Sequence, residues 1–280
     1  VSIGSNNFDR LIYDYYVDPT VLMEAFKADK YDFRAERSAK MWATGYDFPA
    51  KQEGKVVTMT FPRNASGVMQ ALVPNLRLPK YQDARVRRAL NLAFDYETLK
   101  RTVFFDLYDR IDSFYFGTEL AAKNLPSPEE LALLEPLRDK LPPVVFTAPY
   151  ANPVGGTPEA VRNNLRQAVA LFAEAGWTIR DGKMRNTKGE PFRIEYLTFS
   201  SLDERYIAPF AKALGRIGID LDLRLVDDAQ YLNRTRSFDF DMTVDVWGQS
   251  LSPGNEQREM WGSKAANLPG SRNTAGIKDA

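Results

Sequence analysis

The segment spanning residues 238–246 constrains the fold of this chain more than any other. Apolar and polar residues alternate along it, a period typical of a β-strand with one face in a core and the other toward solvent. The next residues are rich in Gly, Pro, Ser and amide side chains, as in loops that carry binding sites. We therefore predict a strand that leads from a core into a functional loop. The apolar positions are Phe238, Phe240, Met242, Val244 and Val246, and the polar ones are Asp239, Asp241, Thr243 and Asp245.

A second pattern predicts the sheet that this strand joins. Alternating segments at residues 192–199 and 219–225 flank a helical segment, which a capping box of Ser201 and Glu204 opens and Gly218 ends. A strand, a helix and a strand of these lengths form a parallel, right-handed crossover. The predicted fold class is therefore α/β.

Further elements are predicted on both sides of this unit. Asp83 caps a helix whose apolar residues recur at helical spacing, and a second helix spans residues 158–175 between Thr157 and Gly176. Asp181 and Gly182 occupy the turn of a hairpin. Towards the N-terminus, strands are predicted at residues 8–18, 31–34 and 55–62, and a helix begins at Pro19.

The composition excludes several kinds of site. The 280 residues contain no Cys and no His, which removes thiol nucleophiles, imidazole bases and soft-metal sites. The 37 Lys and Arg balance the 37 Asp and Glu, so bulk charge attracts neither nucleic acid nor an anionic membrane. No apolar run approaches the roughly 20 residues of a membrane helix. We therefore predict no cofactor, no metal and no nucleic-acid partner.

Four motifs follow one another along the chain. They are NLRLPKYQDARVRRALNLAFDYETL at residues 75–99, LYDRIDSFYFGTELAA at 107–122, LFAEAGW at 171–177 and FDFDMTVDVWGQSLSPGNEQ at 238–257. Their order resembles that of solute-binding proteins of family 5, which bind dipeptides and oligopeptides for ABC importers. The segment SLSPGNEQR is similar to the branch associated with peptide and microcin C uptake.

This resemblance implies a lobe of the class II (cluster C) periplasmic-binding-protein-like fold, with a mixed sheet flanked by helices. Residues 1–50 would be the late part of lobe I and the hinge approach, and residues 51–280 would be lobe II, the ligand-binding lobe. The N-terminal part of lobe I and the C-terminal return segment are expected to be absent. The complete protein would be a periplasmic monomer that delivers a peptide or peptide-like solute to an ABC permease of the inner membrane. Its signal peptide would lie outside this chain.

The resemblance also assigns the ligand site. Trp247 corresponds to a loop tryptophan beside the peptide, and the backbone at Val246, Gly248 and Gln249 would add to an extended ligand as a strand does. Ser250 stands where peptide-binding members have an aspartate that pairs with the ligand's amino terminus. Either Glu256 replaces this anchor or the ligand has no free amine there. The full set is Asn75, Val246, Trp247, Gly248, Gln249, Ser250, Asn255 and Glu256, with Asn75 open to a structural role and Trp247→Ala expected to leave the fold intact.

Three other interpretations of the residues stay open at this point. Asp239 and Asp241 form a DxD pattern that could hold a divalent ion for glycosyl or phosphoryl transfer, although outward positions on a strand also explain them. Gly155 and Gly156 precede a helix and could cradle a phosphate, but the lysine of a P-loop is missing. A plain interaction module is the third alternative.

Overall fold

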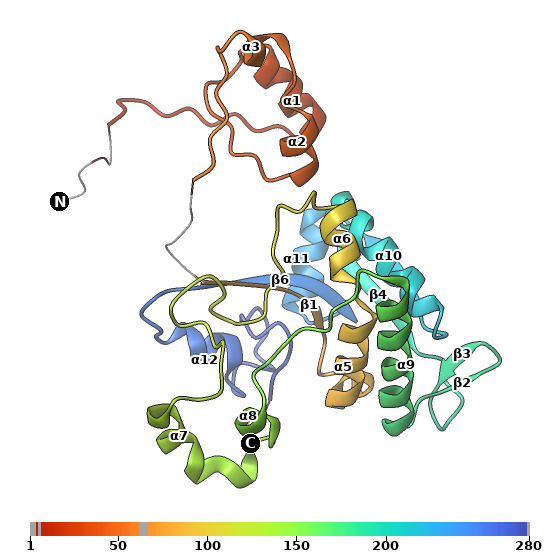
Figure 1. Cartoon of the computed structure of the whole chain (residues 1–280). Helices are drawn as coiled ribbons and strands as arrows, with labels where there is room; N and C mark the ends of the chain where they lie inside the picture. Colours follow the sequence, from red (N-terminus) through yellow and green to blue (C-terminus); the bar gives the residue numbers. More distant parts are fainter. Residues whose placement is uncertain (1–3, 5–6, 62–66, 279–280) are drawn as a thin grey trace. The chain divides into compact units, whose positions relative to one another are not determined.

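The computed structural model describes residues 4, 7–61 and 67–278, and the chain divides into two compact units, Val1–Phe61 and Pro62–Ala280 (Figure 1). We call them unit 1 and unit 2 and describe each by itself. The change from lobe I to lobe II that the resemblance places near residue 50 stays a prediction. Within the described residues, no helix has the length and apolar character needed to cross a membrane.

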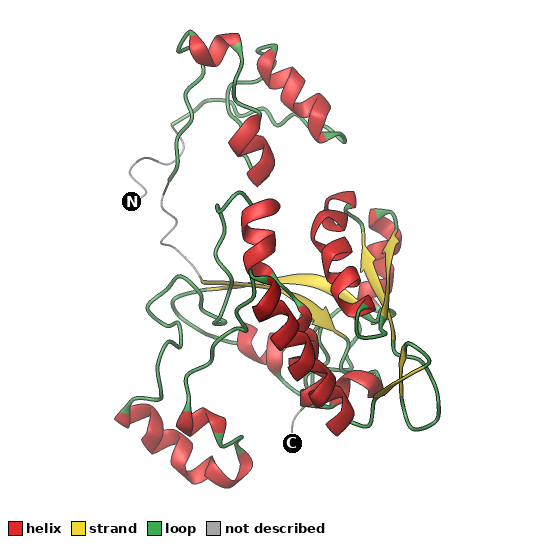
Figure 2. Ribbon diagram, turned by 45° about the vertical axis from the view of Figure 1, so that its right-hand side comes forward, coloured by secondary structure: helices red, strands yellow, loops and turns green. Residues whose placement is uncertain are grey.

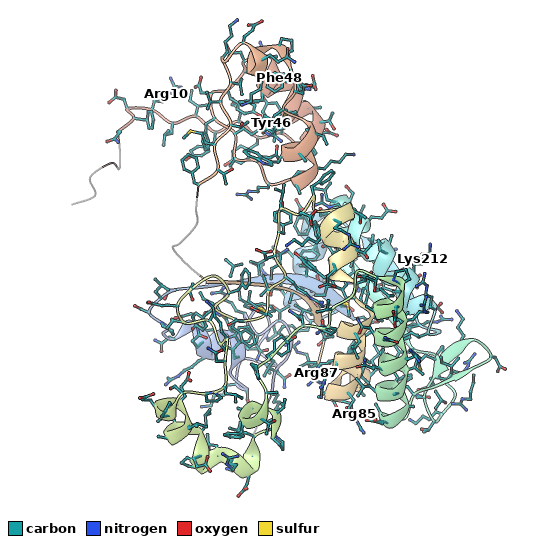
Figure 3. All side chains as sticks on the ribbon, viewed as in Figure 1. Arg10, Tyr46, Phe48, Arg85, Arg87 and Lys212 are labelled. Carbon is teal, nitrogen blue, oxygen red and sulfur yellow. The ribbon has the colours of Figure 1, made fainter. Side chains whose placement is uncertain are left out.

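Unit 1 consists of three short helices around a group of aromatic rings. The helices are α1 (Pro19–Lys27), α2 (Ala39–Thr44) and α3 (Pro49–Gln52). The carboxylate of Asp18 accepts from the amide of Thr20 at 2.6 Å and begins α1, as the proline at its first turn predicted. Rings of neighbouring aromatic residues lie 5.4–6.5 Å apart, and Figure 3 labels Tyr46 and Phe48 among them.

The three strands predicted in unit 1 are wrong. Residues 8–18, 31–34 and 55–61 form no strand, and the last predicted residue, Pro62, lies outside the described residues. Their apolar side chains are largely exposed, with Tyr15 at 92%. Among the described residues of unit 1, no other segment pairs with these three. A strand forms only where another strand completes its hydrogen bonds.

Unit 2 is built on a mixed, four-stranded sheet. Its strands are β1 (Gly67–Pro74), β6 (Met242–Gln249), β4 (Arg193–Thr198) and β5 (Asp220–Leu225), in that spatial order. β4 and β5 are parallel and joined through α10 (Glu204–Gly215), which confirms the predicted crossover. β1 runs antiparallel to β6 along its whole length.

Helices pack beside this sheet and bury its core (Figure 2). Asp83 caps α5 (Ala84–Ala93) by accepting from the amide of Arg85 at 2.8 Å, and α5 packs against α9 (Pro158–Glu174), so both predicted helices are confirmed. Figure 3 labels Arg85 and Arg87 of α5. The largest buried side chains of this core include Tyr81, Phe172, Phe192, Tyr196 and Met242. The remaining helices near the sheet are α4 (Pro79–Gln82), α6 (Tyr96–Thr102), α11 (Asp228–Arg236) and α12 (Glu256–Trp261).

Two smaller features lie outside the sheet. β2 (Thr178–Arg180) and β3 (Lys183–Arg185) form the predicted hairpin, and its turn residues Asp181 and Gly182 have φ of 50° and 73°. Positive φ at both positions matches the twist that a two-residue hairpin needs. A separate excursion contains α7 (Pro128–Leu134), the 3₁₀ helix η1 (Glu135–Lys140) and α8 (Val144–Thr147).

The central strand differs from its prediction in limits and in burial. β6 begins at Met242, because Phe238 adopts a φ of 60° and the segment before Met242 turns. It continues through Gln249, so Trp247 is part of the strand and not of a loop. Thr243 is fully buried and Val246 is 50% exposed, the reverse of the predicted faces, because the two halves of the strand have different neighbours.

Candidate functional site

The two halves of β6 have different neighbours in the sheet. β1 accompanies β6 from Met242 to Gln249, whereas β4 pairs with it only at Tyr196, opposite Met242. Among the described residues, no strand pairs with the β4-facing side of β6 beyond that point. A strand edge of this kind presents backbone N–H and C=O groups to an additional strand.

The hydrogen-bond pattern shows which residues present those groups. Just before the paired region, the amide of Asn75 donates to the carbonyl of Asp241 at 2.9 Å. Pro74, which has no N–H, lies opposite Met242. Because bonded and non-bonded pairs alternate in an antiparallel ladder, odd-numbered residues of β6 bond to β1 and even-numbered residues point away from it.

The open edge therefore consists of the backbone groups of Val244, Val246 and Gly248. Two contacts agree with this direction. The Val244 carbonyl lies 3.3 Å from the hydroxyl of Tyr231, and the Val246 amide donates to the carboxylate of Asp245 at 2.7 Å. Val246 and Gly248, two of the residues predicted to pair with the ligand backbone, thus lie on one edge. We call Val244, Val246 and Gly248 the open edge of β6.

Trp247 and Gln249 support this edge from the other face of the ribbon. The Trp247 side chain is 4% exposed, its Nε1 donates to the carbonyl of Arg272 at 3.0 Å, and its ring centroid lies 5.1 Å from that of Trp261. Gln249 is 1% exposed and accepts from the amide of Gln257 at 2.6 Å. Both side chains are packing elements, and the backbone of Gln249 faces β1. Direct ligand contact by either residue stays a prediction.

The loop after β6 is organised by its own polar side chains. The hydroxyl of Ser250 donates to the carbonyl of Ser252 at 2.8 Å, and the carboxylate of Glu256 accepts from the amide of Gly254 at 2.7 Å. The backbone bond from Gly254 lowers the pKa of Glu256 below its ordinary value. Asn255 is exposed immediately before α12. Ser250, Asn255 and Glu256 therefore lie beyond the Gly248 end of the open edge.

Asn75 lies at the opposite end of the ribbon. Its side chain is 1% exposed, and its amide donates to the carbonyls of Phe238 and Phe240 at 2.9 and 3.0 Å. Its oxygen accepts from the guanidinium of Arg77, which also donates to carbonyls of residues 266, 273 and 274. These bonds fix the turn before β6, so the structural role that the sequence left open is the one observed.

Sequence reasoning missed two features of the site. One is β1, although the apolar run at residues 67–74 between a glycine and a proline could have indicated a strand. The other is the aromatic pair of Phe199 and Tyr231, whose ring centroids lie 4.8 Å apart beside the open edge. No pattern in the sequence brings these two residues together.

The catalytic and phosphate alternatives do not fit the geometry. Asp241 pairs with Lys80 at 2.7 Å and Asp239 pairs with Arg234 at 2.9 Å. Each carboxylate therefore already forms an ion pair with a separate basic side chain. Within the ranges that the structure describes, no group of three acidic side chains could hold a metal ion. The amides of Gly155 and Gly156 donate to the carboxylates of Glu97 and Asp95 at 2.6 and 2.8 Å, which leaves them closed to a phosphate.

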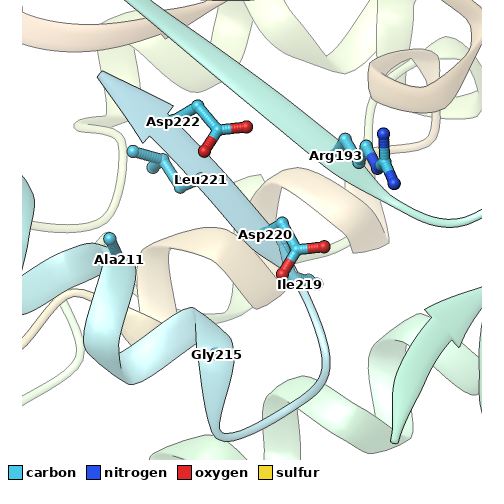
Figure 4. Close-up of a pocket in the computed structure, with 7 residues that line it drawn as sticks. All are labelled: Arg193, Ala211, Gly215, Ile219, Asp220, Leu221 and Asp222. Carbon is cyan, nitrogen blue, oxygen red and sulfur yellow. The ribbon is translucent and has the colours of Figure 1, made fainter. Parts of the chain in front are cut away.

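A shallow hollow of about 410 Å³ lies at the other end of the sheet (Figure 4). Arg193 and Asp220, the first residues of β4 and β5, line it together with Asp222. Asp220 is already paired with Lys183 at 2.6 Å. Because this hollow lies at the amino ends of the parallel strands, it is separate from the open edge at the carboxyl half of β6.

Residues 3–268 match the model of the bacterial extracellular solute-binding proteins, family 5 middle. The chain is 48% identical, over its whole length, to the probable peptide-binding protein YejA of Agrobacterium fabrum, and it covers 46% of that protein. The chain spans 42–46% of the length of the first two curated relatives that it matches, which is less than half.

Solved structures show a similar fold. The oligopeptide-binding protein AppA of Bacillus subtilis, solved with a nonapeptide, matches 94% of this chain with a TM-score of 0.64 at 17% identity, over 45% of its own length. The ABC transporter-associated periplasmic binding protein DppA of Helicobacter pylori, solved with the peptide STSA, matches 93% with a TM-score of 0.58 at 14% identity, over 41% of its length. The predicted periplasmic-binding-protein-like α/β fold class is therefore confirmed.

Proposed function

This chain belongs to the family 5 bacterial extracellular solute-binding proteins, as its motifs predicted, and from that premise we propose that it forms one wall of a peptide-binding site. The ligand is a peptide or a peptide-like solute that binds in an extended conformation along the open edge of β6. The proteins to which the chain is similar are binding proteins and not enzymes, so the transfer-enzyme alternative is wrong.

The open edge is the observation that carries this proposal. Val246 and Gly248 direct backbone groups away from β1, at the half of β6 that β4 does not cover. An extended peptide can add to such an edge through main-chain hydrogen bonds, which give affinity without fixing the peptide's sequence. A wall of this kind suits a protein that accepts peptides of different sequence.

The relatives support the wider role. One is named a probable peptide-binding protein, and DppA is described as a periplasmic protein associated with an ABC transporter. We propose that the full-length protein is a periplasmic monomer that encloses the ligand between two lobes and delivers it to an ABC permease of the inner membrane. The wall described here then supplies only part of the ligand's contacts.

A substitution at Gly248 tests the edge directly. Gly248→Pro removes the N–H that points away from β1, at a position where the ladder does not use it. Gly248→Ala is the matched control, because a Cβ at Gly248 has no heavy atom within 4 Å among its described neighbours. In the full-length protein we expect the proline variant to bind tri- to hexapeptides about tenfold more weakly in calorimetry, and the alanine variant to bind like the wild type.

Two results contradict the proposal in different ways. Equal affinity of the proline variant and the wild type shows that the ligand does not pair with the Gly248 amide. If the wild-type protein binds no peptide of any length in the set, the peptide-binding function itself is wrong. Thermal unfolding of both variants provides the folding control.

A further inference from the structure

Tyr231 contacts β6 at the start of the open edge. The hydroxyl of Thr243 donates to the carbonyl of Leu197 at 3.0 Å, so the two strands still touch one residue beyond their last backbone pair. The Tyr231 hydroxyl, from α11, lies 3.0 Å from the Thr243 hydroxyl and 3.3 Å from the Val244 carbonyl. This carbonyl is therefore occupied, and the next carbonyl along the open edge, that of Val246, has no donor among the described residues, so a ligand strand would pair there.

Phe199 lies against this tyrosine at the end of β4. The strand ends at Thr198, and the ring of Phe199 packs on Tyr231 with an interplanar angle of 56°. Because β4 and β6 are parallel with Tyr196 opposite Met242, counting three residues along each strand sets Phe199 level with Asp245. The ring of Phe199 is linked to the open edge through Tyr231, whose hydroxyl lies 3.3 Å from the Val244 carbonyl.

The two residues of the aromatic pair differ in burial. Tyr231 packs against the buried cluster of Leu197, Val226 and Phe240, and burial raises the pKa of its hydroxyl. Phe199 in contrast is 51% exposed. Peptide-binding proteins that add a ligand strand to a sheet edge select side chains through neighbouring pockets or surfaces. An exposed aromatic ring held by a buried residue next to such an edge can serve as one of these surfaces.

We propose that Phe199, held in place by Tyr231, selects an apolar or aromatic side chain of the bound peptide. The inference rests on the proposed peptide-binding function and specifies one subsite of it. The backbone of the ligand pairs with Val246 and Gly248, and the ligand side chain nearest to β4 covers the exposed ring. Affinity thus comes from the edge, and selectivity at one ligand position comes from the aromatic pair.

A host–guest peptide set measures this selectivity. Alanine pentapeptides that carry a single Leu, Phe or Glu at each position in turn are titrated into the full-length protein by calorimetry. We expect one position at which Leu or Phe binds about tenfold more tightly than Ala, from burial of the added apolar groups. Phe199→Ala should reduce this preference to about twofold, because it removes the half-exposed ring that the ligand side chain would cover.

Tyr231→Phe provides the second variant. It keeps the ring that supports Phe199 and removes the hydroxyl next to Val244, so the side-chain preference persists. A preference that is unchanged in Phe199→Ala overturns the inference, as does an equal loss of affinity for every peptide in the set. Absence of binding by the wild type to all of these peptides contradicts the peptide-binding function instead, so the two failures are distinguishable.

Discussion

Unit 1 and unit 2 are stabilised by different kinds of contact. The centre of unit 1 contains an ion pair: Arg34 and Glu36 lie 3.0 Å apart with both side chains 7% exposed, and the hydroxyls of Tyr31 and Tyr46 bond to them. The centre of unit 2 is an apolar core between the sheet and its helices, in which Tyr81, Phe172, Phe192 and Leu214 are fully buried.

This difference determines how each unit responds to change. A buried ion pair stabilises only while both partners are present and charged, since removal of one leaves a buried, uncompensated charge. An apolar core depends on shape and volume and loses stability by amounts that follow the atoms removed. The stability of unit 1 should therefore depend on charge and pH, and the stability of unit 2 on cavities left by truncated core side chains.

The largest effect is expected from Glu36→Gln in unit 1. The substitution keeps the size of the side chain but leaves Arg34 without its counter-charge, at a cost of about 3–5 kcal/mol. Such a loss is comparable to the whole stability of a unit of this size. Hydrogen exchange of the amides in α1 and α2 of the full-length protein measures it, and these amides should exchange at nearly the rate of unfolded chain.

Glu24→Gln is the matched control for this prediction. Glu24 also pairs with a cation, Lys27, at 2.9 Å, but its side chain is 63% exposed. An exposed pair of this kind contributes about 0–1 kcal/mol, so exchange in α1 should hardly change. Similar exchange rates in the two variants would show that the Arg34–Glu36 pair is not what holds unit 1.

The same two units show what the sequence could predict of the fold. The helix at Pro19 in unit 1 and two long helices of unit 2 were predicted, because a proline at the first turn, a cap such as Asp83 and an apolar stripe are local signals, whereas the short helices α2 and α3 were not. The crossover of unit 2 was found because a short chain segment joins its parallel strands. The three strands of unit 1 were wrong, since alternation describes a side-chain pattern and does not supply a pairing partner.

The candidate site was less accessible to prediction than the fold. The stretch around Val246 and Gly248 could be located by resemblance, and the structure places both residues on the open edge. The side-chain faces could not be predicted, because α12 and the backbone of Arg272 cover Trp247 and Gln249, and only the tertiary fold brings these segments together. The contact of Phe199 with Tyr231 joins residues 32 positions apart, and no pattern in either segment of the sequence predicts it.

Trp247→Ala tests the packing of unit 2 near the site. The sequence suggested that this substitution leaves the fold intact, but the side chain fills a small cluster with Val73 and Met260. We expect a loss of about 3 kcal/mol, at the low end for a buried aromatic residue, because this cluster is smaller than the main core. Urea unfolding measures it.

Val246→Ala is the control for that cluster. Val246 is the neighbouring residue on the same strand and points to the other face, where it is 50% exposed. Its truncation should change the unfolding free energy by less than about 0.5 kcal/mol. Equal stability of the Trp247 and Val246 variants would mean that the small cluster of Trp247, Val73 and Met260 does not contribute to the stability of unit 2.

A smaller effect is expected from Asn75→Ala. The substitution leaves the buried carbonyls of Phe238 and Phe240 without their donor, which costs about 1–3 kcal/mol. The loss should be independent of pH, since no ionised group takes part in these two bonds. An unfolding free energy that stays at the wild-type value would remove Asn75 from the residues that fix the start of β6.

The smallest expected effect is the response of unit 1 to acid pH. Burial by itself raises the pKa of Glu36, but the bonds from the Ser38 amide and from Arg34 outweigh it, so the pKa lies below its ordinary value of 4.5. A carboxyl group whose pKa is lowered by folding stabilises the folded state above the unfolded pKa, and this contribution is lost as the pH falls through the folded value. Exchange in α1 and α2 should therefore accelerate below about pH 4.5, beyond the intrinsic pH dependence of exchange. This excess should be absent in Glu36→Gln, and a wild-type protein whose unit 1 shows no excess at acid pH would break the contrast between the two units.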